Sequence, residues 1–175
     1  MRMIRLALFA ALSRMKHEGH ARSSTLCIRF RAAVHEDLLW QLASEYGVAD
    51  LIEVCPAVPY LAALEEMCLA DGLLILQAGD CNDQIPGKVY EYLRANRPIL
   101  CLADPRGDTS RLVTDAGIGF TADLSDSPAI ESVLRSFLEA LNHGSADVPK
   151  PSSIANASRS RRTEQLAGFL EQLIH

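Results

Sequence analysis

The chain has 175 residues, of which 49% are hydrophobic and 22% are charged, the balance of an ordinary globular protein. Its 22 acidic residues outnumber its 17 lysines and arginines, and the net charge of −5 argues against binding to nucleic acid through bulk positive charge. Aromatic residues make up only 6% of the chain, which disfavours a stacking platform for single strands. The length fits one compact domain.

The first 15 residues predict an amphipathic helix, because Ile4, Leu8, Ala11 and Met15 recur at helical spacing. The apolar stretch within them is short for a secretion signal, and no apolar run is long enough to span a bilayer. We therefore expect a cytoplasmic protein.

No metal site is expected. The segment 17–20 (His-Glu-Gly-His) spaces its two histidines by three residues, whereas the zincin motif needs four, and no cysteine pair has the C-x-x-C spacing. Cys27, Cys55 and Cys101 lie in apolar runs and are predicted to be buried, reduced thiols. Trp40, beside Leu39 on a helical pattern, is predicted to belong to the core.

Short apolar runs alternate with helical patterns along most of the chain. Strands are predicted at 26–30, 51–55, 73–76, 98–102 and 118–121. Helices are predicted at 37–46, 59–69, 86–95, 108–116, 127–141 and 158–174. This alternation is typical of βαβ units, so we expect an α/β fold, a Rossmann-like three-layer sandwich with a mostly parallel sheet.

We interpret residues 1–175 as a single domain with three parts. The α/β core covers 1–142, a Pro- and Ser-rich linker covers 143–157, and a C-terminal helix covers 158–175. Arg159, Arg161 and Arg162 begin this helix. A solvated basic turn is the simpler interpretation, and weak association with an anionic membrane surface is the alternative.

Ligands of open parallel sheets bind outside the carboxyl ends of the strands. Three connections there carry distinctive polar residues, namely 56–60, 79–84 and 104–110. None contains the G-x-G-x-x-G dinucleotide fingerprint or the G-x-x-x-x-G-K-[ST] phosphate loop. Neither a dinucleotide cofactor nor P-loop chemistry is expected, and no other cofactor is implied.

The helix predicted after residue 85 begins with features of an anion site. Pro86 suits its first position, which leaves the amides of Gly87, Lys88 and Val89 free to bind a phosphate. Lys88 adds a positive charge, and Glu91 offers a carboxylate to vicinal hydroxyl groups. A sugar carrying a diphosphate fits this set. The simpler alternatives are that Asp83 is a helix cap and that Lys88 and Glu91 form an i, i+3 pair.

The segment 85–93 (IPGKVYEYL), followed by 97–100 (RPIL), resembles the donor-site segment of retaining GT-B glycosyltransferases, the group often called family 4. The flanking segments 58–60, 70–74, 107–109 and 116–119 are also similar, and the likeness runs from about residue 26 to 141 and over the last helix. It implies binding of a nucleoside diphosphate sugar and transfer of the sugar with retention, without a bound metal.

The resemblance implies a role for each candidate residue. Asp83 and Glu91 match an acidic pair with seven residues between, although Asp83 stands where the family usually has Glu. Asp83 is the catalytic candidate near the transferred sugar, with Asn82 as a neighbouring substrate-binding residue. Glu91 would hold the ribose, and Gly87 and Lys88 would face the diphosphate. The loop at 57–58, with Ala57 and Val58, would lie against the base.

The resemblance covers only the C-terminal, donor-binding half of such an enzyme. The acceptor-binding half would come from an N-terminal domain or another chain, and the first strand of the donor half would precede Met1. That strand is central in the strand order 3-2-1-4-5-6, so its absence leaves two unpaired edges. We expect repair by a partner chain, by a swapped segment, or by closure of the two flanking strands against each other.

Three functions follow as hypotheses. The first is a glycosyltransferase donor domain. The second is a non-catalytic, truncated GT-B remnant that acts as a binding or interaction module. The third is an unrelated flavodoxin-like binding domain.

Overall fold

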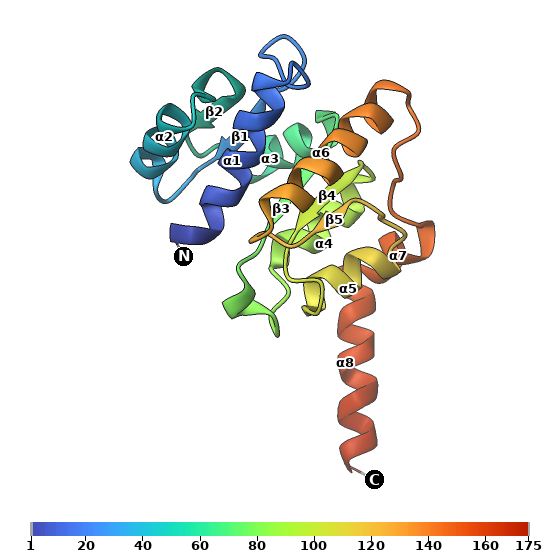
Figure 1. Cartoon of the computed structure of the whole chain (residues 1–175). Coiled ribbons are helices and arrows are strands. Elements are labelled where there is room, and N and C mark those ends of the chain that lie inside the picture. Colours follow the sequence, from blue (N-terminus) through green and yellow to red (C-terminus); the bar gives the residue numbers. More distant parts are fainter. Residues whose placement is uncertain (1, 175) are drawn as a thin grey trace.

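The computed structural model describes residues 2–174, with side chains from residue 6 to 173. Helices and strands alternate through its first 142 residues (Figure 1), as the sequence predicts. The strands are β1 (Ile28–Arg31), β2 (Ile52–Cys55), β3 (Leu73–Leu76), β4 (Ile99–Leu102) and β5 (Thr121–Ala122). The helices are α1 (Arg2–His17), α2 (Glu36–Glu45), α3 (Tyr60–Leu69), α4 (Gly87–Ala95), α5 (Asp108–Asp115), α6 (Ser127–Asn142), α7 (Pro151–Asn156) and α8 (Arg159–Ile174). Two single turns of 3-10 helix are η1 (Ala49–Leu51) and η2 (Gly79–Cys81).

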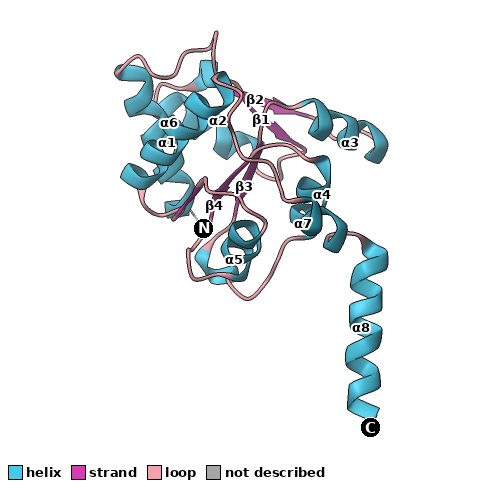
Figure 2. Cartoon of the chain, turned by 90° about the vertical axis from the view of Figure 1, so that its right-hand side faces the viewer, coloured by secondary structure: helices cyan, strands magenta, loops and turns pink. Residues whose placement is uncertain are grey.

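The strands form two all-parallel sheets. β1 pairs with β2, with Ile28 opposite Ile52. β4 lies between β3 and β5 in a three-stranded sheet, in which Leu73 is opposite Ile99. Helices lie on both sides of the strands (Figure 2), so the predicted α/β class with parallel pairing and three layers is confirmed.

The five strands do not form one continuous sheet. Among the described residues β1 pairs only with β2, and β3 pairs only with β4. Direct closure of β1 against β3, one of the expected repairs, is therefore absent from residues 2–174. The chain from Arg2 onward is helical in α1 and adds no strand to either sheet.

One apolar core lies under α1 and α6 and joins both sheets. It buries Leu8, Leu12 and Met15 of α1 and Leu134 of α6 against residues of α2, β2 and β4. These α1 residues include two of the positions whose helical spacing predicts the helix. The burial of apolar surface on this shared face holds the two sheets together.

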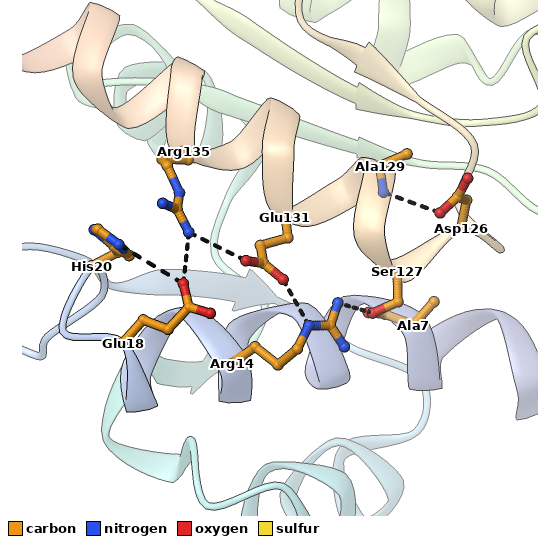
Figure 3. A network of polar contacts seen from close by, with 9 residues as sticks. All are labelled: Ala7, Arg14, Glu18, His20, Asp126, Ser127, Ala129, Glu131 and Arg135. Atoms are coloured by element: carbon orange, nitrogen blue, oxygen red, sulfur yellow. Dashed lines mark hydrogen bonds and ion pairs between the residues drawn. The ribbon is translucent and has the colours of Figure 1, made fainter.

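Polar contacts reinforce the packing of α1 on α6 (Figure 3). The Arg14 Nε donates to Glu131 Oε2 at 2.6 Å, and its Nη2 donates to the Ser127 hydroxyl at 2.8 Å. That hydroxyl donates in turn to the Ala7 carbonyl at 2.8 Å. Arg135 on α6 adds a bond of 3.2 Å to Glu131. Because Arg14 donates to the Glu131 carboxylate, the pKa of Glu131 is lowered.

A second apolar core lies on the opposite face of the three-stranded sheet only. Ile75 and Ile99 of the strands pack there with Val89 and Leu93 of α4 and Val113 of α5. β4 is consequently buried along its whole length. The β1–β2 sheet has no comparable second core among the described residues.

The C-terminal third of the chain corrects two sequence predictions. The segment 143–157 is only partly a linker, because it contains α7, which contacts α4 and ends at the buried Ala157. Pro151 starts this helix. The prolines and serines of the segment are typical of a linker, so the sequence does not predict the helix. The last strand pairs at residues 121–122 rather than 118–121, since Ile118 is buried in the second core and lies outside the ladder.

Some burial predictions are wrong. Trp40 is 42% exposed although its neighbour Leu39 is buried, because the two side chains leave α2 on different faces. Cys101 is buried as predicted, and burial raises its pKa to about 12. Cys27 is exposed and Cys55 is half-buried, since the β1–β2 sheet lacks a second covering layer.

α8 projects away from the rest of the protein (Figure 1 and Figure 2). Its apolar residues Leu166, Phe169, Leu170 and Leu173 are exposed. At its start, the Arg162 guanidinium lies 4.0 Å from the centre of the Tyr90 ring on α4. None of the helices within residues 2–174 is long and apolar enough to cross a membrane.

Candidate functional site

The helix that follows β2 contacts the helix that follows β3 through a hydrogen bond between side chains. Tyr60, the first residue of α3, follows β2, and Glu91 lies on α4, which follows β3. The Tyr60 hydroxyl donates to Glu91 Oε1 at 3.1 Å. The end of the connection after β2 and the helix after β3 therefore lie together.

Glu91 has the accessibility that a ligand-binding carboxylate requires. It is half-buried, and its Oε1 is held by a residue at the start of the neighbouring helix. The i, i+3 pair that the sequence offers as an alternative is not formed, because no ion pair between Lys88 and Glu91 occurs in the described part of the chain. The carboxylate is thus partly accessible and is tied to α3.

The start of α4 is open, with one correction to the sequence prediction. The amide of Val89 is not free, since it donates to the Pro86 carbonyl at 2.9 Å. The amides of Gly87 and Lys88 have no acceptor among the described residues. A Cβ placed on Gly87 would meet no atom within 4 Å, so this end of the helix is accessible to a ligand. Free amides and the helix dipole favour an anion there.

Lys88 follows directly at this helix start. The residue is exposed, yet surrounding protein atoms displace enough water from its ammonium group to lower its pKa. A desolvated cation gains stability when an anion replaces the lost water. Lys88 is therefore suited to contact a phosphate group.

The loop with Asn82 and Asp83 is held in place by the protein itself. Asn82 Nδ2 donates to Asp104 Oδ2 at 2.7 Å, and the Asn82 carbonyl accepts the Asp108 amide at 2.9 Å. Gln77 Nε2 donates to the carbonyls of Cys81 and Gln84, both at 2.6 Å. Asn82 thus ties this loop to the connection after β4, and the adjacent Asp83 is exposed to solvent.

Ala57 and Val58 lie in the connection from β2 to Tyr60, where Ala57 is exposed and Val58 is half-buried. The preceding carbonyl, of Pro56, accepts a bond of 2.7 Å from Arg31 Nη1. This bond fixes the start of the connection on β1. The Tyr60 contact then places its other end beside Glu91, so the structure brings this connection together with α4.

A separate pocket of about 450 Å³ lies at the carboxyl ends of the three-stranded sheet. It is lined by Gln77, Gly79, Asp80, Asp104, Arg106, Asp123, Leu124 and Ser125, and none of the predicted site residues is among them. The Gln77 Oε1 atom is buried without a partner in the structure. The sequence signal for this pocket is an aspartate after each of two strands, Asp104 after β4 and Asp123 after β5. Only Asp104 belongs to one of the connections that the sequence marks as polar.

Charge decides what this pocket can hold. Arg106 and Asn82 donate to the Asp104 carboxylate, which lowers its pKa strongly and keeps it ionised. With Asp80 and Asp123 also present, three carboxylates face one arginine. A pyrophosphate is repelled there, so the start of α4 is the better anion site. Within the described residues, no group of three or more His, Cys, Asp or Glu side chains is placed to hold a metal ion.

Comparisons of the chain with family models, with curated proteins and with solved structures found no match.

Proposed function

We propose that this protein binds a nucleoside diphosphate sugar at the start of α4 and acts as the donor-binding domain of a glycosyltransferase. The observation that carries the proposal is the Tyr60–Glu91 hydrogen bond of 3.1 Å, because it joins the connection after β2 to the open start of α4. Transfer itself requires an acceptor-binding domain, which an additional domain or another chain supplies.

Each part of the donor has a matching group. The Glu91 carboxylate accepts hydrogen bonds from the ribose hydroxyls, and the amides of Gly87 and Lys88 bind the diphosphate. Ala57 and Val58 offer apolar contact to the base. Asp83 and Asn82 belong to the loop nearest the transferred sugar in this assignment.

The chemistry that follows is stabilisation of a leaving group. Negative charge grows on the nucleoside diphosphate as the bond between the sugar and the phosphate oxygen breaks. Preorganised amides and the Lys88 ammonium lower the barrier by stabilising this charge. The same proposal places the protein in the cytoplasm, a reducing compartment, because its five cysteines are free thiols.

A second candidate is a non-catalytic binding module. It is favoured by Asn82, whose amide is used to hold Asp104 and is not free for a substrate. It is also favoured by Asp83, which is exposed to solvent. In this case the donor binds but its sugar is not transferred or hydrolysed.

Titration calorimetry with UDP, GDP and ADP sugars tests binding. One of the three is expected to bind, and Glu91→Gln is expected to weaken it at least about tenfold, because a charged acceptor of the ribose is lost. Glu65→Gln, on exposed α3 surface, is the matched control and should leave the affinity unchanged. A folded protein that binds none of the three at millimolar concentration would contradict the proposal.

Slow hydrolysis of the bound donor separates the two candidates. Loss of hydrolysis in Asp83→Asn with unchanged donor affinity supports the glycosyltransferase. Tight binding with no turnover in the unchanged protein, even with acceptor sugars added, supports the module.

A further inference from the structure

The pocket at the carboxyl ends of the three-stranded sheet receives a polar side chain from the end of each strand. Gln77 follows β3, Asp104 follows β4 and Asp123 follows β5, and all three line the pocket. Its volume of about 450 Å³ lies within the range of small-molecule sites. Ligands of open parallel sheets bind at this edge. The pocket is therefore a place where a second ligand is expected.

The strand pairing continues one residue beyond the strands and sets the width of the pocket. The Gln77 amide donates to the Leu102 carbonyl, and the Ala103 amide donates to the Ala122 carbonyl, both at 3.0 Å. Gln77 is thus opposite Ala103, which is in turn opposite Asp123. Residues at one level of a sheet direct their side chains to the same face. Gln77 and Asp123 therefore lie on either side of the small Ala103, with their Cα atoms two strand spacings, or about 10 Å, apart.

Gln77 brings to this pocket a buried acceptor that no described residue satisfies. The residue is only 7% exposed. Its Nε2 donates to the carbonyls of Cys81 and Gln84, both at 2.6 Å, whereas its Oε1 has no partner. Because the oxygen and nitrogen of an amide point in different directions, these two bonds direct Oε1 away from the two carbonyls. A buried acceptor without a hydrogen bond is unfavourable, so a donor from a ligand is favoured here.

Negative charge is in excess around this acceptor. The Asp104 carboxylate accepts from Arg106 Nη2 at 3.2 Å and from Asn82 Nδ2 at 2.7 Å. The Arg106 side chain is 88% exposed, so water screens its charge and it offsets one carboxylate at most. Asp80 and Asp123 form no ion pair within the described residues. Two carboxylates are therefore left to attract a cation.

The arrangement of acceptors narrows the kind of cation. Asp123 Oδ1 already accepts the amide and hydroxyl of Ser125, at 2.8 Å and 2.7 Å, and its other oxygen is left for a ligand. A ligand that reaches both Asp123 and Gln77 must carry donors at separate positions. A protonated amine supplies charge and three donors, and hydroxyl groups supply neutral donors. A small sugar ring that carries an amino group has both.

We propose that this pocket binds an amino sugar. The carboxylate charge of Asp80 and Asp123 holds the ammonium group, and a ring hydroxyl donates to Gln77 Oε1. The site is separate from the start of α4, so the inference goes beyond the proposed function and does not rest on it.

An NMR titration of the labelled full chain tests the proposal with three sugars that share one ring: glucosamine, glucose and glucuronate. It is carried out at about pH 6, where the amine is protonated and the carboxylates are ionised. Glucosamine should bind at least about tenfold more tightly than glucose, because the ammonium makes charge-assisted hydrogen bonds. Glucuronate should bind more weakly than glucose. The side-chain amide signals of Gln77 should shift with glucosamine, since they report a new donor at its oxygen.

Variants separate the charge of the pocket from its shape. Asp80→Asn changes an exposed side chain and should weaken glucosamine at least about threefold while leaving glucose unchanged. Asp123→Asn should weaken it further, although the variant keeps an oxygen for Ser125. Asp71→Asn, exposed before the amino end of β3, is the matched control and should change neither affinity. Added salt should weaken glucosamine more than glucose.

Four results would overturn the proposal. Equal affinities for glucosamine and glucose, or a preference for glucuronate, would show that the carboxylates do not select a cation. Binding that Asp80→Asn and Asp123→Asn leave unchanged would place the sugar elsewhere. Saturation without a shift of the Gln77 side-chain amide would show that its oxygen takes no part. No saturable shifts at tens of millimolar glucosamine would mean that water alone occupies the pocket.

Discussion

The three-stranded and two-stranded sheets have the same strand direction but differ in how they are covered. The three-stranded sheet has an apolar core on each face, and all four residues of β4 are buried. In the two-stranded sheet only one face is covered by a core, and β1 has no fully buried residue.

The difference follows the amino-acid pattern of the strands. β3 (LLIL) and β4 (ILCL) are apolar at every position, as expected of strands covered on both sides. β1 (IRFR) alternates apolar and charged residues, and its arginines pair with Glu53 and Glu66. The two halves therefore derive different stability from burial.

The largest expected effect is a contrast between matched isoleucines in the two sheets. Ile75 of β3 is fully buried, and truncation to alanine should cost about 2–5 kcal/mol of unfolding free energy. Ile28 of β1 is half-buried, and the same truncation should cost about 1 kcal/mol. Urea unfolding of both variants measures the difference, and equal losses would remove the distinction between the sheets.

Close packing at the start of β3 gives the next effect. A Cβ on Gly72 would lie 2.5 Å from Cζ of Phe137, so Gly72→Ala should destabilise the protein by about 1–3 kcal/mol. Adding Phe137→Leu, which shortens the clashing side chain, should recover part of this loss. Gly87→Ala has open space around its Cβ and serves as the stability control. A Gly72→Ala variant as stable as the control would show that α6 packs less closely on β3.

Acid sensitivity should distinguish the layer that joins the sheets. The Arg14 bond lowers the folded-state pKa of Glu131, so its stabilising contribution is present above the unfolded pKa and is lost as pH falls through the folded value. Glu131→Gln should therefore lose up to about 1 kcal/mol at neutral pH and much less in acid. Unfolding below about pH 4, where free glutamate protonates, measures this. Glu139→Gln, exposed on the same helix, is the control, and a pH dependence equal to that of Glu131→Gln would contradict the assignment.

The smallest expected effect concerns α8, which is attached to the three-stranded half through Arg162 and Tyr90. Arg162→Ala removes a cation–π contact of about 0.5–1 kcal/mol. Amides in the first two turns of α8 should then exchange about 2–5 times faster. Arg159→Ala, at the exposed start of the same helix, provides the comparison. Equal rates in the two variants would mean that other contacts hold α8.

The order and type of the core elements could be predicted because apolar periodicity is local. β3 is found at its predicted residues, since a short, continuous apolar run next to Gly72 and Gln77 leaves little choice of boundary. β5 could not be placed, because pairing with β4 rather than local composition selects Thr121 and Ala122. The core position predicted for Trp40 is wrong, since the exact angle around α2 decides its burial.

The candidate site could be predicted only in part. The sequence indicates that a helix starts near Pro86. The hydrogen bond from the Val89 amide to the Pro86 carbonyl could not be predicted, because it depends on the local geometry of that turn. The sequence does not reveal Tyr60 as a partner of Glu91, because the two residues are 31 positions apart and meet only when α3 and α4 pack. The use of Asn82 to hold Asp104 likewise depends on the docking of two loops.

The most direct test of donor binding is an NMR titration of the labelled full chain with UDP, GDP and ADP. We expect one nucleotide to shift the amide signals of Gly87 and Lys88 in a saturable way, with the shifts weakened in Glu91→Gln. Shifts confined to the pocket of Gln77, Asp104 and Asp123, or no shifts with any of the three nucleotides, would contradict binding at the start of α4.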